Sequence, residues 1–294
     1  MHARIPKNFV LEERLERYAD AIEVAPAAYR GRWAEACWPL GAAGAATEPS
    51  PTEGTGAHGR PCAPGRYREV HLDLGCGKGS FIIEMARRAP DALFLGMDSE
   101  PLCVAYAAQH VLEAGIPNAL VIPGTASNLD GLFAPGELAG ITINFPTPWP
   151  KKRNAGERIV NADHLASYRA LLAPGGTVTL RTDSQPLFDY ALPQFEAAGY
   201  RARWVSRDAR ADHPELPASE YEEKLSAQGA TVNGICAEPG PEPTAEQLAR
   251  ALQLPQSLYD YLPENLFDGA YIPHGMSYGV TNLRNQRLRA GERG

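Results

Sequence analysis

The sequence predicts an α/β protein built on a doubly wound, mostly parallel β-sheet. From Glu69 onward, short apolar segments of strand length alternate with helical stretches, which is typical of a parallel sheet covered by helices on its faces. A glycine-rich turn follows the first of these strands, at the position where such sheets bind ligands. The length of 294 residues, of which 44% are apolar, suffices for one large or two small domains.

The chain before this pattern divides into two segments. Residues 1–40 contain helix-like stretches of mixed charge. Residues 41–65 are dominated by Ala, Gly, Pro, Thr and Ser and show no hydrophobic period. Such a composition cannot bury enough apolar surface to offset the entropy of ordering, so we expect a flexible insert there.

The α/β pattern itself occupies residues 66–229. Strands are predicted at residues 70–74, 93–97, 119–122, 141–145 and 177–181, and a late strand at 200–205. Helices are predicted at residues 80–88, 100–113, 162–172 and 187–198. The second helix should have Ser99 as N-cap and Pro101 in its first turn, and should end near Gly115. Residues 171–176, with Pro-Gly-Gly at their end, should lead from helix to strand through a turn.

The remaining chain, residues 230–294, is interpreted as a C-terminal extension of unknown role. It begins with three closely spaced prolines, continues with a predicted helix at 245–252, and ends in a tail with four arginines. The arginines are Arg284, Arg287, Arg289 and Arg293.

Composition and charge exclude several classes of protein. No apolar run is long enough to span a membrane, and the N-terminus lacks the features of a signal peptide, so we expect a cytoplasmic protein. Five scattered cysteines without a C-x-x-C pair, and seven histidines without ligand spacing, predict neither disulfides nor a metal site. The net charge of -7 argues against indiscriminate nucleic-acid binding, and we expect no DNA partner.

The turn from Asp73 to Gly79, Asp-Leu-Gly-Cys-Gly-Lys-Gly, predicts a nucleotide-type cofactor. Its glycines permit close backbone approach to a ligand, and Asp98 ends the next strand 21 positions after Gly77, where a carboxylate can accept from ribose hydroxyls. The spacing is G-x-G-x-G rather than G-x-G-x-x-G, which favours S-adenosylmethionine over NAD. A tight connection without any ligand is the alternative interpretation.

Residues 144–153, Asn-Phe-Pro-Thr-Pro-Trp-Pro-Lys-Lys-Arg, leave the fourth strand at the edge where a substrate would meet the cofactor. The three prolines should hold Trp149 and the basic triplet in a fixed direction. Lys and Arg at this place suit phosphate contacts, and together with Arg158 and several basic residues of the first 32 positions they could form one basic surface. A rigid surface loop with solvated cations is the alternative.

With these segments in view, the sequence resembles the bacterial tRNA (guanine-N7)-methyltransferases, which are class I S-adenosylmethionine-dependent enzymes. The resemblance covers most of residues 4–229 and depends on residues 29–33, 73–79, 144–153, 181–183 and 219–224. It implies a seven-stranded Rossmann-like sheet. It also implies methyl transfer from S-adenosylmethionine to N7 of a guanine in the tRNA variable loop.

The resemblance also assigns site residues. It places Thr147 at the catalytic position. The implied cofactor contacts are Asp73, Gly75, Gly77, Asp98, Thr125, Ala126 and Thr147. The implied substrate contacts are Lys151, Asp183, Ser219, Glu220, Tyr221 and Glu222.

This chain departs from the family pattern at several of these positions. The family usually has Asp at 125 and 147, Glu at 73, His at 154 and a basic pair at 156–157. Guanine N7 has a lone pair and no proton, so we expect positioning rather than a general base: Asp183 and Glu222 would hold the base and Lys151 a phosphate. As structural alternatives, Asp183 could cap a turn and Glu222 could pair with a nearby lysine.

Two other functions remain open at this point. A methyltransferase of the same fold could act on a small molecule or another RNA, because the fold alone does not define the substrate. A non-catalytic cofactor-binding or RNA-binding relative could use the C-terminal extension as its partner surface.

Overall fold

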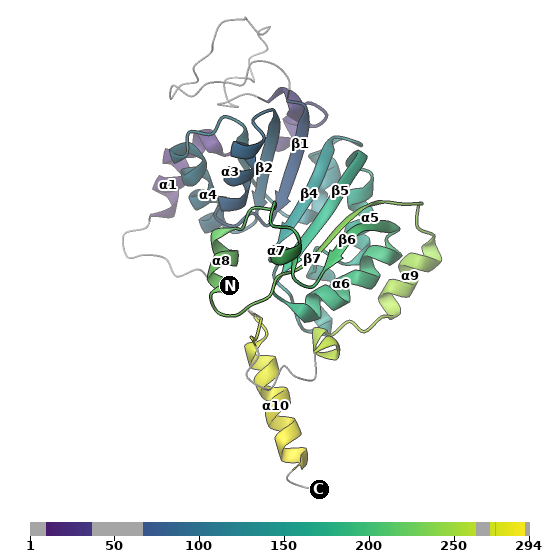
Figure 1. Cartoon of the computed structure of the whole chain (residues 1–294). Coiled ribbons are helices and arrows are strands. Elements are labelled where there is room, and N and C mark those ends of the chain that lie inside the picture. Colours follow the sequence, from purple (N-terminus) through teal and green to yellow (C-terminus); the bar gives the residue numbers. More distant parts are fainter. Residues whose placement is uncertain (1–9, 37–66, 263–270, 274, 292–294) are drawn as a thin grey trace, which may run out of the picture. The chain divides into compact units, whose positions relative to one another are not determined.

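The computed structural model describes residues 10–36, 67–262, 271–273 and 275–291 (Figure 1). The predicted flexible insert at 41–65 lies outside the described residues. Seven strands form a mostly parallel sheet in the order β3-β2-β1-β4-β5-β7-β6, which confirms the predicted fold class. Contacts between residues divide the chain into two compact units. The first consists of residues 1–144 and 170–176, and the second of residues 145–169 and 177–294.

The first unit contains the parallel strands. Strand β1 (Glu69–Leu74) pairs in parallel with β2 (Ala92–Asp98) and with β4 (Leu138–Asn144), and β2 pairs in parallel with β3 (Ala119–Pro123). These strands are apolar almost throughout because helices and loops cover the sheet, and Leu72, Leu95 and Val121 are buried. Since the strands are parallel, the carboxyl ends of β1, β2 and β4 lie at one edge of the sheet.

Two helices connect these strands. Helix α3 (Ser80–Arg88) follows β1 and buries its apolar stripe, including Phe81 and Ile82. Helix α4 (Pro101–Glu113) follows β2 and packs small residues such as Ala107 against its neighbours. A Cβ on Gly79 would lie 3.1 Å from the Cβ of Ala107, so this glycine permits the close approach of the two helices.

The start of α4 differs from the prediction. Its N-cap is Glu100 and not Ser99. The backbone N–H of Glu100 donates to Oδ1 of Asp98 at 2.9 Å. The aspartate at the end of β2 therefore fixes the entry into the helix, and the serine hydroxyl is not needed.

The N-terminal segment adds short helical pieces to the first unit. These are α1 (Leu11–Arg17) and the 3₁₀ turns η1 (Ala19–Ala21), η2 (Pro26–Tyr29) and η3 (Trp33–Glu35). Trp33 is fully buried, and its indole N–H donates to the carbonyl oxygen of Leu132 at 2.9 Å. A further turn, η4 (Ala126–Gly131), follows β3.

The second unit contains the antiparallel part of the sheet. Strand β7 (Asn233–Pro239) pairs antiparallel with both β5 (Leu172–Thr182) and β6 (Tyr200–Ser206). The sheet thus continues beyond residue 229, the predicted end of the α/β domain. The helices are α5 (Ala162–Arg169), α6 (Gln185–Ala197), α7 (Ala209–Asp212), α8 (Glu220–Ser226), α9 (Ala245–Gln253) and α10 (Ser277–Gly291), with the 3₁₀ turns η5 (Lys152–Glu157) and η6 (Leu258–Tyr261).

A turn does connect α5 to β5, but it lies at residues 170–171, earlier than the predicted helix end at residue 172. Helix α5 ends at Arg169, and β5 already begins at Leu172. The carbonyl oxygens of Ala170 and Leu171 accept hydrogen bonds from the N–H groups of Gly136 and Leu138 at 2.9 and 2.8 Å. These bonds tie the turn at residues 170–171 to the chain around the start of β4, so the helical pattern of the sequence does not continue to residue 172. Within the described part of the chain, no helix is long and apolar enough to cross a membrane.

Candidate functional site

The glycine-rich turn after β1 leaves open space beside its backbone. Gly75 and Gly77 have φ angles of 82° and 55°, in the left-handed region that favours glycine. A Cβ built on either residue would meet nothing within 4 Å. The N–H groups of Gly75 and Cys76 donate to the carbonyl oxygen of Met97 at 2.8 and 3.0 Å. The turn is therefore anchored to β2 and offers an unfilled cradle for a ligand.

Asp98 connects this turn with α4. Its Oδ2 accepts from the N–H of Gly77 at 2.9 Å, and its Oδ1 accepts from Glu100. Burial raises the pKa of this carboxyl, although the backbone N–H donors act in the opposite direction. Each carboxylate oxygen has a second lone pair, so Asp98 can still accept from ligand hydroxyls.

Asp73 lies at the end of β1 and is only 4% exposed. Its Oδ1 accepts from Nδ2 of Asn144, the last residue of β4, at 3.2 Å. Oδ1 of Asn144 is buried and has no hydrogen-bond partner among the described residues. Two polar groups, one of them with unused acceptor capacity, thus lie together at the carboxyl ends of neighbouring strands.

Thr125 and Ala126 lie just beyond β3, in the same unit. Thr125 is exposed and is the N-cap of η4, where its hydroxyl accepts from the N–H of Ser127 at 3.4 Å. Ala126 is buried in the first turn of η4. The structure thus gives Thr125 a local capping role, and it places Asp73, Gly75, Gly77, Asp98, Thr125 and Ala126 in one unit.

In the second unit, residues 145–158 form a strained loop, which we call the proline loop. Phe145 and Trp149 have φ angles of 51° and 47°, which are unfavourable for residues with a Cβ. The guanidinium of Arg158 holds this conformation. It donates to the carbonyl oxygens of Pro148 at 3.2 Å and of Trp149 at 3.1 and 2.7 Å.

Arg158 also connects the proline loop to the C-terminal extension. Its Nη2 donates to the carbonyl oxygen of Gln256 at 2.9 Å, and its guanidinium lies 4.4 Å from the ring centroid of Tyr190. The N–H of Leu258 donates to the carbonyl oxygen of Pro150 at 2.9 Å. Arg158 is 1% exposed, so its interpretation as part of a basic surface is wrong. Sequence reasoning missed this buried role, because nothing in the local pattern distinguishes Arg158 from the basic triplet.

The exposed residues of the proline loop include the predicted site residues Thr147 and Lys151. Lys152 and Arg153 are exposed beside them. The loop backbone is rigid because three prolines and Arg158 fix it. The structure therefore presents a cationic triplet on a preorganised backbone.

Arg181 and Glu222 form a buried ion pair in the second unit. Nη2 of Arg181 donates to Oε2 of Glu222, and Nη1 donates to the carbonyl oxygen of Pro217 at 2.9 Å. Glu222 is 0% exposed, and its Oε1 has no hydrogen-bond partner among the described residues. The partner of Glu222 is thus an arginine, and not the nearby lysine of the structural alternative, and one carboxylate oxygen keeps its acceptor capacity.

The other predicted residues of this segment have local roles. The hydroxyl of Ser219 caps α8 by accepting from the N–H of Glu222 at 3.1 Å. Glu220 is exposed and pairs with Lys224 at 2.6 Å. Tyr221 is exposed and packs edge-on against Phe145, with ring centroids 5.5 Å apart.

Asp183 has an unexpected partner. The hydroxyl of Tyr271 in the C-terminal extension donates to Oδ2 of Asp183 at 2.6 Å. Burial raises the pKa of Tyr271, and the hydrogen bond to Asp183 raises it further. Burial and the nearby Asp183 also raise the pKa of Tyr221 to about 12. The cap of the following helix α6 is Ser184, so Asp183 does not have the alternative capping role. Sequence reasoning missed Tyr271, which is 88 residues away from its partner.

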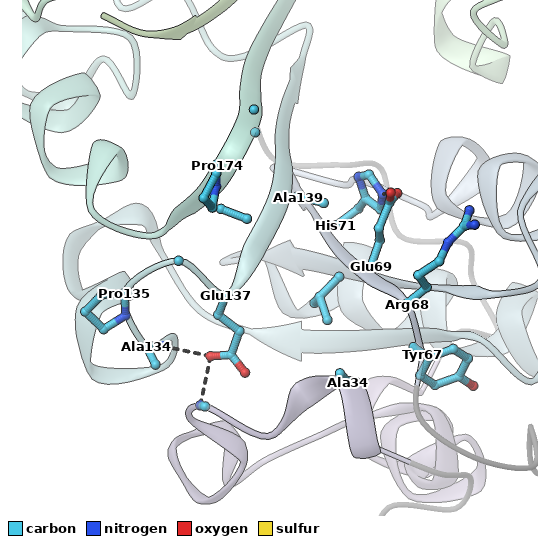
Figure 2. Close-up of a pocket in the computed structure, with 16 residues that line it drawn as sticks. Ala34, Tyr67, Arg68, Glu69, His71, Ala134, Pro135, Glu137, Ala139 and Pro174 are labelled. Atoms are coloured by element: carbon cyan, nitrogen blue, oxygen red, sulfur yellow. Dashed lines mark hydrogen bonds and ion pairs between the residues drawn. The ribbon is translucent and has the colours of Figure 1, made fainter. Parts of the chain in front are cut away.

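A hollow of about 940 Å³ lies elsewhere in the first unit (Figure 2). It lies against the amino ends of β1 and β4, which is the edge opposite to the glycine-rich turn. One of the two glutamates that line it, Glu137, accepts from the N–H groups of Gly31 and Ala134, both at 2.8 Å. This carboxylate serves to hold the chain together, and the hollow is not the predicted cofactor site. No cluster of His, Cys, Asp or Glu suited to a metal ion occurs in the ranges that the structure covers.

Comparison with known proteins first defines the class. Residues 67–234, more than half of the chain, match a family model described as "Putative methyltransferase". A protein named tRNA (guanine-N(7)-)-methyltransferase from Geobacillus thermodenitrificans is 39% identical over 166 residues, which are 56% of this chain and 77% of that protein. Proteins of the same name from Streptococcus suis and Geobacillus kaustophilus are 36% and 37% identical, over 57% and 56% of this chain and 80% of each of theirs.

The chain therefore belongs to the tRNA (guanine-N7)-methyltransferase family, which confirms the resemblance inferred from its motifs. The similar region ends before most of the C-terminal extension, since the family model stops at residue 234.

Proposed function

We propose that the protein transfers a methyl group from S-adenosylmethionine to N7 of a guanine in the variable loop of tRNA. The observation that carries this proposal is the open glycine cradle, flanked by Asp73 and Asp98, in a chain that belongs to this family. We expect the reaction to take place in the cytoplasm.

The residues of the first unit fit the cofactor. Asp98 would accept from the ribose hydroxyls, Asp73 would face the ammonium group of the methionine part, and Gly75 and Gly77 would let the backbone approach the ligand. Thr125 and Ala126, and Thr147 of the proline loop, complete the proposed contacts. When bound, S-adenosylmethionine supplies an electrophilic methyl group.

The residues of the second unit fit a nucleotide of RNA. Oε1 of Glu222 is a buried acceptor without a partner in the described chain, which suits an N–H group of guanine. Asp183 would accept a hydrogen bond from a second N–H group of guanine. The hydroxyl of Tyr271, which donates to this carboxylate, would then either keep its hydrogen bond beside the base or be displaced by it. Tyr221 offers an exposed ring for stacking, and Lys151 a charge for a phosphate.

No residue is proposed as a general base. Guanine N7 has an in-plane lone pair and carries no proton, so the chain has only to hold the base in line with the methyl group. Thr147 at the catalytic position would act by positioning. This requirement agrees with a loop whose backbone is fixed by Arg158.

The test is methyl transfer from labelled S-adenosylmethionine to tRNA that lacks N7-methylguanine, followed by chemical cleavage at N7-methylguanine. We expect label at one variable-loop guanine, and none in the same tRNA with adenine at that position. Absence of label, with cofactor binding intact by calorimetry, would contradict the proposal. That result would favour methyl transfer to another RNA or to a small molecule, or a non-catalytic role.

A further inference from the structure

The C-terminal helix α10 (Ser277–Gly291) is anchored near its start by the buried side chains of Met276 and Val280, and its outer part is exposed and cationic. We propose that the outer part, residues 281–289, is an arm that binds the phosphate backbone of the substrate RNA. This inference rests on the proposed tRNA substrate. It assigns a role to a part of the chain that lies beyond the region matched by the family model.

The start of the helix is firmly attached to the second unit. Met276 is 0% exposed, and its Sδ lies 3.5 Å from Oγ of Ser184, while Val280 is 2% exposed. A Cβ on Gly279 would lie 2.0 Å from the hydroxyl oxygen of Tyr259, so only glycine fits there. The arm therefore begins at a defined place on the protein surface.

That place adjoins the proposed substrate residues. Ser184, which contacts Met276, directly follows Asp183, and Asp183 accepts the hydrogen bond from Tyr271 a few residues before the helix. An RNA held at Asp183 would therefore have the start of α10 as its neighbour.

Between residues 281 and 289 the helix has no buried face. Residues 281–289 are exposed except for Leu283, which is half-buried, and even Leu288 is exposed. A helical segment that buries none of its faces gains little from packing on its own domain. Its outer part is therefore suited to an external partner.

The charges of the arm indicate the kind of partner. Arg284, Arg287 and Arg289 are all exposed, and residues 277–291 contain no Asp or Glu, although the whole chain has a net charge of -7. Arg284 and Arg287 are three positions apart and so share a face of the helix. With a rise of about 1.5 Å per residue, the arm extends roughly 13 Å beyond Val280. These features fit a polyanion with regularly spaced charges, and the RNA backbone is that partner here.

The test compares two triple variants of the full chain. The arm variant is Arg284→Gln/Arg287→Gln/Arg289→Gln. The control variant, Arg68→Gln/Arg87→Gln/Arg250→Gln, removes the same charge from exposed arginines whose carboxylate partners are Asp91, Glu84 and Glu246. The dissociation constant of tRNA is measured by fluorescence anisotropy between 50 and 300 mM salt, roughly the range over which phosphate contacts are screened.

We expect the arm variant to bind tRNA about tenfold more weakly at 100 mM salt. The slope of log K against log salt should decrease by about 2, at about 0.7–0.9 for each lost phosphate contact. The control variant should stay within about twofold of the parent chain, and the affinity for S-adenosylmethionine should be unchanged in both. The KM for tRNA should rise in the arm variant while kcat is retained.

Equal affinity and equal slope in the two variants would overturn the proposal, as would a parent chain that does not bind tRNA. Loss of binding to vesicles with anionic lipid, with tRNA binding unchanged, would also overturn it and point to a membrane surface. The two proposals are separable. If tRNA binding depends on the arm but no methyl group is transferred, the proposed role of the arm stands and the proposed reaction is wrong. If methyl transfer proceeds with unchanged KM in the arm variant, the proposed reaction stands and the proposed role of the arm is wrong.

Discussion

The proposed cofactor residues of the first unit and the proposed substrate residues of the second unit are held in place in different ways. In the first unit, the glycine-rich turn and Asp98 are held by hydrogen bonds of backbone N–H groups between the ends of β1 and β2, which are consecutive strands of the chain. In the second unit, the proline loop is held by remote contacts, above all by Arg158, which also binds Gln256, 98 residues further on. Local backbone geometry therefore creates the cofactor cradle, whereas long-range contacts create the substrate side.

The C-terminal extension belongs to this long-range support. Gln256 and Leu258 contact Arg158 and the proline loop, and Tyr271 contacts Asp183. These contacts give part of the extension a structural task within the second unit. Substitutions on the substrate side should therefore change stability and activity together, and those on the cofactor side should separate them.

The largest effect is expected from Glu222→Gln. The substitution keeps the shape of the side chain but leaves the buried guanidinium of Arg181 without its counter-charge. Removal of one partner of a buried ion pair costs about 3–5 kcal/mol. Denaturant unfolding should show this loss, and methyl transfer should fall with it.

A second variant distinguishes structure from substrate binding. In Arg181→Met/Glu222→Leu both charges are removed, and most of the lost stability should return because apolar groups can replace a buried pair. Methyl transfer should stay low if Glu222 also accepts from the base. Full recovery of activity in this double variant would show that Glu222 has only a structural role.

Arg158→Ala should have the next largest effect. It removes the donors to three backbone carbonyls and releases a loop with two strained residues, so we expect a loss of about 3 kcal/mol and an activity about 100-fold lower. Arg158→Lys should recover little, because an ammonium cannot reproduce the planar set of donors. Arg250→Ala, at an exposed arginine, is the control and should change stability by less than about 0.5 kcal/mol. Retention of activity in Arg158→Ala would mean that the proline loop need not be preorganised.

The sequence predicts the first unit well for a physical reason. Each strand there pairs in parallel with its neighbours and is buried, so a short apolar run is a sufficient signal, and helix α3 is found at its predicted bounds. The glycine turn is equally local, since positive φ angles at Gly75 and Gly77 require glycine. The predicted N-cap of α4 is wrong because the sequence pattern assigns Asp98 to ligand binding alone, whereas its carboxylate also accepts from the first N–H group of the helix entry.

The substrate side is less predictable because its partners are remote in the sequence. Nothing near Arg158 indicates that it is buried rather than exposed like Lys151. Likewise, no local pattern pairs Tyr271 with Asp183, or Arg181 with Glu222. Such contacts follow from the tertiary fold, and the extension of β5 to Leu172 shows the same dominance of sheet pairing over local preference.

On the cofactor side, Gly77→Ala should affect binding more than folding. The left-handed backbone costs about 1–2 kcal/mol for alanine, and the new methyl group enters the open cradle. We expect the Kd for S-adenosylmethionine to rise at least tenfold by calorimetry. Gly136→Ala is the matched control, because Gly136 also has a positive φ, of 72°, and open space, but lies at the opposite edge of the sheet. Equal Kd values in the two variants would exclude the cradle as the binding site.

A smaller, pH-dependent effect is expected at Asp98. Burial raises the pKa of this carboxyl, so the folded protein holds its proton at a pH where the unfolded chain has lost it. Stability of the unliganded protein should therefore fall as the pH rises through that raised pKa, whereas cofactor affinity should rise as the acceptor becomes ionised. Asp98→Asn should bind about tenfold more weakly at pH 7, and its affinity should lose this pH dependence. An unchanged pH profile of binding in Asp98→Asn would assign the titration to another group.

The smallest effect is expected from Thr147→Asp, which restores the carboxylate that the family usually has at this position. Thr147 is exposed on a loop whose backbone Arg158 fixes, so a carboxylate can be added there without burying a charge. A charged hydrogen bond contributes about 1.5 kcal/mol or more, and we expect methyl transfer to increase up to about tenfold. Thr147→Asn, which has the same shape as aspartate without its charge, is the control. A gain in Thr147→Asp alone would mean that the site of this chain is a weakened form of the family's site. Equal rates in all three proteins would mean that a hydroxyl at this position is sufficient, and that the catalysis depends on the geometry of the loop rather than on its charge.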